Sequence, residues 1–312
     1  MNLTGKKVLV TGGCGFLGSH LVDKLVETGA KVTVVDLKTT EGDRNLGPIL
    51  DEIEFVEIDI TRKESFDAFS HDFDVIFHLA AYAAPSLCEK NPDIAFRVNV
   101  QGTFNVLKFA KKNKLSKMVF SSTAALYGTY PDRLPIDESH PLKVDESVYS
   151  ITKFMGEEMC SLYSGMGVPI VVLRLFTTFG PKQSYDYFFP TLISQALGKK
   201  EIELWSDKPT RDFNFVGNTV DALMRAAESD FVGGPVNIGS GKETNVGVIA
   251  KKIADEMGVQ LKFLDKEVIG PMRLCCDNKK AKDTIGWEPS VSLEDGLKIT
   301  IEWYKNNSNA KI

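Results

Sequence analysis

The sequence predicts an α/β protein with a doubly wound parallel sheet, followed by a second, smaller mixed α/β domain at the C-terminus. In the first half, short β-branched and apolar runs alternate with helical patterns. These runs lack the period-2 alternation of a half-exposed strand, so we expect strands that are covered by helices on both faces. The pattern of predicted elements changes after about residue 176, where helical segments predominate and glycine-rich breakers appear.

Each element of the first domain follows from an apolar run or a helical period. The expected strands are 7–11, 31–36, 54–57, 74–78, 117–121 and 169–174, and the expected helices are 16–27, 93–112 and 147–165. In the second domain we expect helices at 185–197, 218–228, 245–256 and 293–305, strands at 201–204 and 213–216, and breakers at 233–235 and 239–241. The predicted domains are residues 1–175 and 176–312. Within the second, residues of about 211–235 are expected to pack back into the first domain.

Composition narrows the class of protein. The chain of 312 residues carries a formal charge of −5, and it is 43% hydrophobic and 25% charged, which is ordinary for a globular protein. The mild acidity argues against nucleic-acid binding, and no apolar run is long enough to cross a membrane. No signal peptide is evident, and the five cysteines and four histidines have no metal-ligand spacing. We expect a reduced, cytoplasmic protein without a metal.

The strongest local motif is a glycine-rich turn between the first strand and the first helix, Thr-Gly-Gly-Cys-Gly-Phe-Leu-Gly at 11–18. Glycines let a ligand approach the backbone N–H groups of a helix N-terminus, which favours a pyrophosphate. The spacing is GxxGxxG rather than GxGxxG, and a plain tight turn is the alternative. Asp36 ends the next strand 18 positions after Gly18, where a carboxylate is expected to bind the adenosine ribose hydroxyls. Its charge favours NAD over NADP, whereas Lys38 would soften that preference.

A second group of residues has the composition of a proton-transfer site. Tyr149 and Lys153 are four positions apart, so they share a helix face and the ammonium can stabilise a phenolate. Ser121, Ser122 and Thr123 follow an apolar strand, at the edge where doubly wound sheets bind ligands. A solvated helix face is the alternative for the Tyr–Lys pair. His78, at the end of another strand, is expected in the core or at the cofactor edge.

Together these motifs resemble the extended short-chain dehydrogenase/reductase family, in its NAD-dependent nucleotide-sugar epimerase and dehydratase branch, similar to UDP-glucose 4-epimerases. The resemblance implies a Rossmann-type first domain and covers nearly the whole chain. It rests on the glycine loop, Asp59-Ile60, Leu79-Ala80-Ala81, Asn99, Ser121-Ser122-Thr123, Tyr149 with Lys153, Phe179-Gly180-Pro181, Arg211-Asp212-Phe213 and Gly286-Trp287-Glu288-Pro289.

The resemblance also implies roles for individual residues. Tyr149 would be the base that takes a sugar hydroxyl proton while hydride passes to NAD, with Lys153, Thr123 and Ser122 as the other catalytic residues. Substrate contacts would come from Thr123, Thr177, Arg211 and Arg273, the two arginines binding the diphosphate. The cofactor-binding set would be Gly12, Gly15, Phe16, Leu17, Gly18, Asp36, Asp59, Ile60, Leu79, Ala80, Ala81, Asn99, Ser121, Tyr149 and Lys153.

Two departures from the family pattern bear on the reaction. In 4,6-dehydratases, the residues after the threonine are the Asp and Glu that eliminate water, whereas this chain has Ala124 and Ala125. Many relatives have Asn where this chain has Thr177. We therefore expect a nucleotide-sugar 4-epimerase with NAD as cofactor. A 4,6-dehydratase, a 4-dehydrogenase or reductase, and a catalytically silent NAD-binding scaffold stay open as alternatives.

The helix at 93–112 suggests a partner. It carries apolar residues on more than one face, with Phe96, Val100 and Phe104 on a line separate from Ala95 and Val106. A helix that lies against a sheet needs only one such face. The sequence therefore predicts a homodimer that forms through the helices at 93–112 and 147–165, with cover by the chain's own loops as the alternative.

Overall fold

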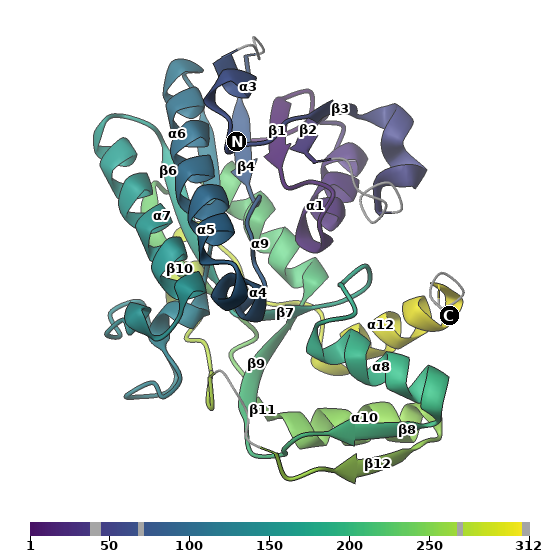
Figure 1. The fold of residues 1–312 in the computed structure, drawn as a ribbon. Helices are drawn as coiled ribbons and strands as arrows, with labels where there is room; N and C mark the ends of the chain where they lie inside the picture. Colours follow the sequence, from purple (N-terminus) through teal and green to yellow (C-terminus); the bar gives the residue numbers. More distant parts are fainter. Residues whose placement is uncertain (38–44, 68–71, 267–270, 308–312) are drawn as a thin grey trace.

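A computed structural model describes residues 1–37, 45–67, 72–266 and 271–307, and Lys38 lies outside these ranges. It has a large upper lobe built on one sheet and a smaller lower lobe (Figure 1). The large sheet has seven strands in the order β10-β6-β5-β4-β1-β2-β3, and every neighbouring pair is parallel. This confirms the predicted doubly wound fold. The strands are β1 Lys7–Thr11, β2 Lys31–Asp36, β3 Glu54–Glu57, β4 Val75–His78, β5 Lys117–Thr123, β6 Ile170–Leu175 and β10 Gly233–Ile238.

Helices cover both faces of this sheet (Figure 1). One layer contains α1 (Phe16–Glu27), α9 (Val216–Glu228) and α11 (Lys279–Ile285), and α9 contacts α1, β5 and β6. The other contains α3 (Lys63–Asp67), α6 (Thr103–Lys112) and α7 (Val148–Gly165), with α7 packed on β5 and β6. Shorter elements are η1 Gly47–Glu52, α4 Pro85–Lys90, α5 Pro92–Ala95, the π-helical η2 Phe96–Gly102, η3 Ala124–Tyr127 and η4 Val144–Glu146.

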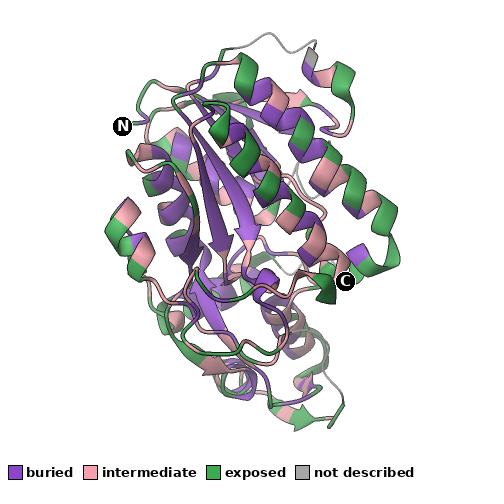
Figure 2. Cartoon of the chain, turned by 90° about the vertical axis from the view of Figure 1, so that its left-hand side faces the viewer, coloured by how far each residue is buried: buried purple, intermediate pink, exposed green. Residues whose placement is uncertain are grey.

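The absence of alternation in the strand sequences is explained by two cores. Along β1, Val8 and Val10 point to the core under α1 and α9, whereas Leu9 points to the core under α6 and α7. Because successive side chains of a strand point to opposite faces, both faces of a sheet covered on both sides must be apolar. Figure 2 shows this as central strands that are buried along their length, with exposed residues on the outer sides of the helices.

The smaller lobe continues from the carboxyl edge of the large sheet (Figure 1). Strands β11, β9 and β7 form a three-stranded sheet, and β12 pairs with β8. No helix in the described ranges is both long and apolar enough to span a bilayer. The elements of this lobe are β7 Thr177–Phe179, α8 Phe188–Lys199, β8 Glu201–Leu204, β9 Thr210–Phe215, β11 Glu243–Asn245, α10 Val246–Met257, β12 Gln260–Phe263 and α12 Leu293–Asn307.

One predicted element is wrong. Gly233-Gly234-Pro235 was expected to break the chain, but these residues begin β10, which pairs with β6 as an outer strand of the large sheet. The register shifts between Gly233 and Val236, and Gly234 has a φ of +156°. An edge strand tolerates a proline because one of its sides needs no ladder donor, and glycine accommodates the irregular backbone. The expected boundary at residue 175 stays a prediction.

Candidate functional site

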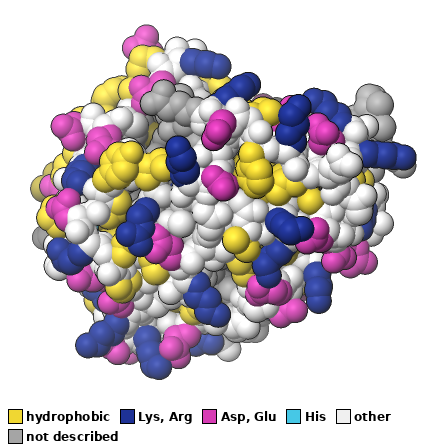
Figure 3. Space-filling view, turned by 90° about the horizontal axis from the view of Figure 1, so that it is seen from below, with side chains coloured by type: hydrophobic (Ala, Val, Ile, Leu, Met, Phe, Trp, Pro, Cys, Tyr) yellow, Lys and Arg dark blue, Asp and Glu magenta, His cyan; other side chains and the backbone are white. Residues whose placement is uncertain are grey.

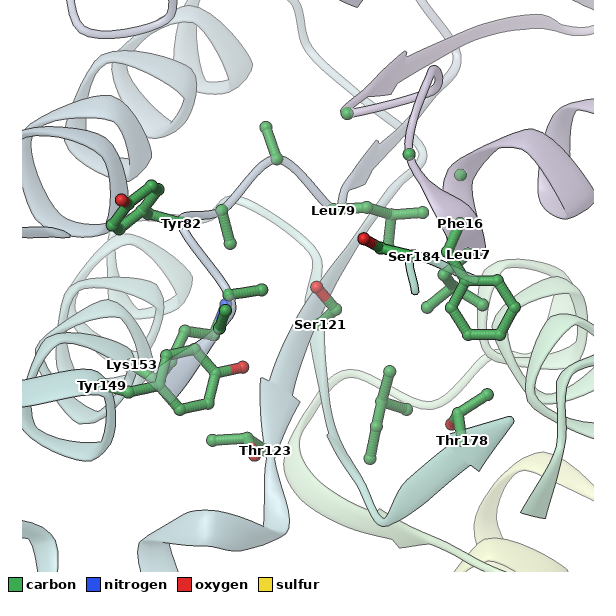
Figure 4. Close-up of a pocket in the computed structure, with 18 of the residues that line it drawn as sticks. Phe16, Leu17, Leu79, Tyr82, Ser121, Thr123, Tyr149, Lys153, Thr178 and Ser184 are labelled. Carbon is green, nitrogen blue, oxygen red and sulfur yellow. The ribbon is translucent and has the colours of Figure 1, made fainter. Parts of the chain in front are cut away.

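A cavity of about 800 Å³ lies between the two lobes, at the carboxyl ends of the large-sheet strands. Figure 4 shows Tyr149, Lys153 and Thr123 on one side, with Phe16 and Leu17 across the space from them. Of the residues predicted for the site, these contribute to the cavity wall: Gly12, Gly15, Phe16, Leu17, Gly18, Asp36, Asp59, Ile60, Leu79, Ala80, Ala81, Ser121, Ser122, Thr123, Tyr149, Lys153, Thr177 and Arg211. Asn99 and Arg273 do not line it.

The glycine loop is shaped by contacts that leave no room for side chains. A Cβ on Gly12 would lie 2.6 Å from the Ala80 nitrogen, and one on Gly18 would lie 2.0 Å from the Gly12 oxygen. The loop is thus packed against the residues after β4 and against its own backbone. Asp36 accepts hydrogen bonds from the backbone N–H groups of Cys14 (2.9 Å) and Leu37 (2.8 Å), which fixes its carboxylate at the cavity.

Tyr149, Lys153 and Thr123 come together from α7 and the end of β5. The Thr123 side chain hydrogen-bonds the Tyr149 phenol, but burial dominates and raises the pKa of Tyr149 above its usual range. Burial lowers the pKa of Lys153 to about 8, and its ammonium lies 4.4 Å from the centre of the Phe120 ring. Tyr149 and Lys153 lie one helical turn apart on α7 and line the same cavity (Figure 4).

Ser122 has a partner that sequence reasoning missed. Its hydroxyl donates to Glu157 Oε1 at 2.5 Å, and Arg174 donates to the same carboxylate from Nε (2.9 Å) and Nη2 (2.6 Å). Arg174 also donates to the Tyr127 hydroxyl at 3.0 Å. Glu157 is one helical turn beyond Lys153, so this buried cluster ties β5 and β6 to the helix that carries the Tyr–Lys pair. A catalytic role for Ser122 stays a prediction.

His78 is fully buried in a hydrogen-bonded chain that defines its tautomer. Thr103 donates to the Asn99 carbonyl oxygen (2.6 Å), so its oxygen accepts from His78 Nε2 at 3.0 Å. The other ring nitrogen, Nδ1, then accepts from the Thr11 hydroxyl at 2.7 Å. Burial, with a smaller contribution from Lys153, lowers the pKa of His78 to about 3. His78 is a neutral core residue beside the site.

Asn99 shapes the cavity without lining it. Its amide accepts from the Tyr82 N–H (2.8 Å) and donates to the Tyr82 carbonyl (3.1 Å) and to Thr152 (3.0 Å). These bonds hold the segment after β4 against α7. Asn99 lies in η2, and a π-helical turn is often found at a functional site. Cofactor contact by Asn99 stays a prediction.

The two arginines predicted for the substrate have different environments. Arg211 lines the cavity from β9, its guanidinium donates to the Thr210 carbonyl at 2.9 Å, and burial lowers its pKa to about 10. Arg273 lies outside the cavity wall and pairs with Glu243 through two contacts of 2.7 Å. The structure brings Arg211, but not Arg273, to the cavity.

The cavity wall also contains residues that were absent from the predicted site. They are mainly aromatic or small side chains from the segment after β4 and from the start of the smaller lobe, and no motif in the sequence marked them. Among them are Tyr82, Ala83, Ala84, Pro85, Leu87, Leu175, Gln183, Asp186 and Tyr187.

Comparison with known proteins assigns the chain to a family. A profile of the NAD dependent epimerase/dehydratase family matches residues 8–239. The chain belongs to this family. It is 35% identical over 310 residues to the putative UDP-glucose 4-epimerase of Methanocaldococcus jannaschii, covering 96% of this chain and 99% of that protein.

Other relatives show how many activities this family includes. The chain is 33% identical over 318 residues to UDP-glucuronic acid decarboxylase 1 of Xenopus tropicalis, covering 96% of this chain and 72% of that protein. The crystal structure of UDP-glucose 4-epimerase with UDP-glucose from Thermotoga maritima matches with a TM-score of 0.90 and 30% identity, covering 97% of this chain and 99% of that one. Membership thus establishes an NAD-dependent nucleotide-sugar enzyme family that includes epimerases, decarboxylases and dehydratases.

NAD is the cofactor of this family, and the cavity fits it. Gly12, Gly15 and Gly18 line the cavity at the start of α1 without side chains, so a pyrophosphate can approach the backbone N–H groups there. Asp36 presents a carboxylate at the end of β2, as adenosine ribose hydroxyls require. The cofactor also has space beside Ser121 and Leu79, which both lie on the wall.

The Ser122–Glu157–Arg174 cluster predicts that loss of the ion pair destabilises the protein more than loss of the serine hydroxyl. Replacing Glu157 with Gln leaves the Arg174 guanidinium buried without its counter-ion, so the free energy of unfolding should fall by about 3–5 kcal/mol. Ser122→Ala, which keeps the ion pair, should cost about 1 kcal/mol. Urea unfolding measures both, with Lys251→Ala as control because Lys251 and Asp255 form an exposed pair. A loss below 1 kcal/mol for Glu157→Gln would contradict the assignment.

His78 predicts a specific acid sensitivity. Its pKa is about 3 when folded and near 6.5 when unfolded, so below pH 6.5 the unfolded chain binds the extra proton. The contribution of His78 to stability is therefore lost as the pH falls from 6.5 toward 3, at about 1.4 kcal/mol per pH unit. Urea unfolding from pH 7 to pH 4 should show a flatter pH dependence for His78→Gln than for the wild type. Parallel curves would show that His78 is protonated in the fold.

Proposed function

We propose that this protein is an NAD-dependent nucleotide-sugar 4-epimerase, with Tyr149 as the catalytic base. The observation that carries the proposal is the combination of Tyr149, Lys153 and Thr123 in one cavity with Ala124 and Ala125 directly after Thr123 on its wall. The first three residue types suffice to move a proton on and off a sugar hydroxyl. The alanines have no proton to transfer, so the usual elimination of water lacks its acid and base.

In this proposal, Tyr149, Thr123 and Lys153 have separate roles in the oxidation at C4. Tyr149 takes the proton of the C4 hydroxyl, and Thr123 orients that hydroxyl by hydrogen bonding. Lys153 is assigned to stabilise the phenolate, and at neutral pH its pKa of about 8 leaves it mostly protonated. When bound, NAD supplies the chemistry of accepting a hydride from C4 and returning it. Inversion requires the sugar to present its other face, for which the cavity offers small side chains at Ala124 and Ala125.

We assign binding of the nucleotide diphosphate sugar to specific side chains at the cavity rather than to a general positive surface charge. Seen from below, the smaller lobe shows lysines and arginines interspersed with acidic side chains rather than one field of positive charge (Figure 3). A diphosphate therefore needs a specific guanidinium, and Arg211 supplies one at the cavity. Thr177, also on the wall, is assigned to the sugar. Arg273 joins them only if the substrate displaces Glu243 from it.

The proposal predicts the effect of removing one hydroxyl. Tyr149→Phe should lower kcat by about 10³-fold, the usual scale for loss of a general base, with little change in stability or in NAD content. Tyr82→Phe is the matched control, because Tyr82 also lines the cavity but its hydroxyl points away from Tyr149 (Figure 4). Steady-state kinetics and cofactor absorbance measure these quantities. Full activity of Tyr149→Phe would contradict the assignment of the base.

Products formed in D₂O separate the epimerase from its alternatives. Inversion at C4 without deuterium supports the epimerase, whereas deuterium at C5 with loss of water indicates a 4,6-dehydratase, for which Asp186 is one of the carboxylates on the cavity wall. A stable keto product with reduced cofactor indicates a 4-dehydrogenase or reductase. If no nucleotide sugar perturbs the absorbance of bound NAD, the chain is a silent scaffold.

We also infer a homodimer through the helices at 93–112 (α5, η2 and α6) and 147–165 (α7). Apolar side chains are exposed along these helices, including Phe96 (40%), Phe104 (39%), Met155 (39%) and Leu162 (58%). A stripe of this kind is expected to be covered by a second copy of the chain. We also propose a cytoplasmic location, because none of the five cysteines, all within the described residues, forms a disulfide; cell fractionation tests that location.

The homodimer predicts a change in mass on one substitution. Leu162→Glu places a charge in the contact, so the wild type should sediment at twice the chain mass and this variant as a monomer. Leu50→Glu is the control, because Leu50 is similarly exposed (46%) but belongs to η1. Sedimentation velocity gives the masses. A monomeric wild type would contradict the dimer, and a dimeric Leu162→Glu variant would contradict this interface.

A further inference from the structure

A short segment of the smaller lobe, residues 181–184, is bound to the first helix of the large lobe. This segment, the strap, lies between β7 and α8. His20 Nε2 donates to the Pro181 carbonyl at 2.9 Å, and the Lys182 ammonium donates to Asp23 Oδ2 at 2.7 Å. His20 and Asp23 are three positions apart on α1, so they share a face of that helix. The strap is therefore attached to the helix whose start fits the NAD pyrophosphate.

A second contact of Lys182 extends toward the glycine loop. Its ammonium donates to the Asn45 carbonyl at 3.0 Å, and the Asn45 side-chain amide donates to the Cys14 carbonyl at 3.0 Å. Cys14 belongs to the glycine loop and lines the cavity. The side chains of Lys182 and Asp23 are 16% and 34% exposed, so their ion pair is partly shielded from water. Lys182 thus links the strap both to α1 and to the glycine loop.

The other half of the strap forms part of the cavity wall. Gln183 and Ser184 line the cavity, as do Phe16 and Leu17 in the first turn of α1. Figure 4 shows Ser184 on the same side of the cavity as Leu17, across from Tyr149. A dinucleotide whose pyrophosphate binds at the start of α1 would therefore lie beside the strap.

The position of the strap leaves two buried oxygens without a protein partner. Among the residues that the structure describes, neither Gln183 Oε1 nor Asn45 Oδ1 accepts a hydrogen bond. The Gln183 amide nitrogen donates to the Thr178 carbonyl at 3.1 Å, which fixes the orientation of the amide. An unpartnered buried oxygen opposes this arrangement, whereas lifting the strap would let water reach it. The closed strap therefore depends on the contacts that Lys182 and His20 make.

We propose that Lys182 is a positioning residue for the cofactor: through Asp23 and Asn45 it holds the strap closed beside bound NAD and slows the exchange of NAD with solvent. NAD enters and leaves when the strap lifts, so the contacts of Lys182 set how often the site is open. The inference needs NAD as the cofactor, but it does not need the 4-epimerase reaction. In the proposed function one NAD molecule accepts and returns the hydride, and slow exchange suits that use.

Exchange of the cofactor tests this role without turnover. Protein loaded with radiolabelled NAD is mixed with an excess of unlabelled NAD, and rapid desalting at intervals gives the release rate. Lys182→Met, which keeps the length and removes the charge, should release NAD about 10-fold faster than the wild type, which corresponds to about 1.4 kcal/mol. Because the strap controls entry as well as exit, the Kd for NAD should change less than about 3-fold. An unchanged release rate would overturn the inference, as would a Kd that rises in proportion to that rate.

Matched variants separate the strap contact from a general loss of charge. Lys24→Met is the control, because Lys24 follows Asp23 on α1 but pairs with Glu27 at 2.9 Å on the exposed side of the helix. Asp23→Asn should also release NAD faster, and the double variant with Lys182→Met should stay within about 2-fold of the faster single variant, because both changes remove one contact. Multiplied effects in the double variant, or equally fast release from Lys24→Met, would overturn the role of the ion pair. Absence of C4 inversion with every nucleotide sugar would contradict only the proposed 4-epimerase, since the exchange rates are measured without substrate.

Discussion

The ion pair between Glu157 and Arg174 is the interaction on which the candidate site depends. Arg174 lies opposite Ser122 in the pairing of β5 with β6 and opposite Asn237 in the pairing of β6 with β10. Glu157 joins these strands to α7, one turn beyond Lys153. A buried pair of this kind adds little net stability over apolar residues, but the loss of one partner is expensive. Its consequence here is geometric: it holds the strand that ends at Thr123 against the helix that carries Tyr149.

Burial is the second constraint on the site, and it shifts the pKa values of both Tyr149 and Lys153. It raises the pKa of Tyr149 and lowers that of Lys153, so both groups are pushed toward their neutral forms. Both side chains line the same cavity, where electrostatic interactions are stronger than in bulk water.

Family membership and local chemistry answer different questions. Relatives at about one-third identity are named as an epimerase and a decarboxylase, so overall similarity does not select the reaction. The selection depends on a few positions in the cavity wall. In the proposed function, Ala124 and Ala125 leave the elimination of water without its usual acid and base.

The sequence by itself determined the parallel sheet, the glycine turn and the Tyr149–Lys153 pair, because each is encoded locally by apolar runs, by closely spaced glycines between a strand and a helix, or by helical spacing. It did not indicate that Gly233–Ile238 forms a strand, since glycine and proline are read locally as breakers and only the neighbouring β6 makes them an edge strand. It also did not distinguish Arg211 at the cavity from Arg273 outside it, or show that Ser122 bonds Glu157. Those outcomes depend on contacts between residues far apart in the chain, which local pattern does not contain and only the tertiary structure decides.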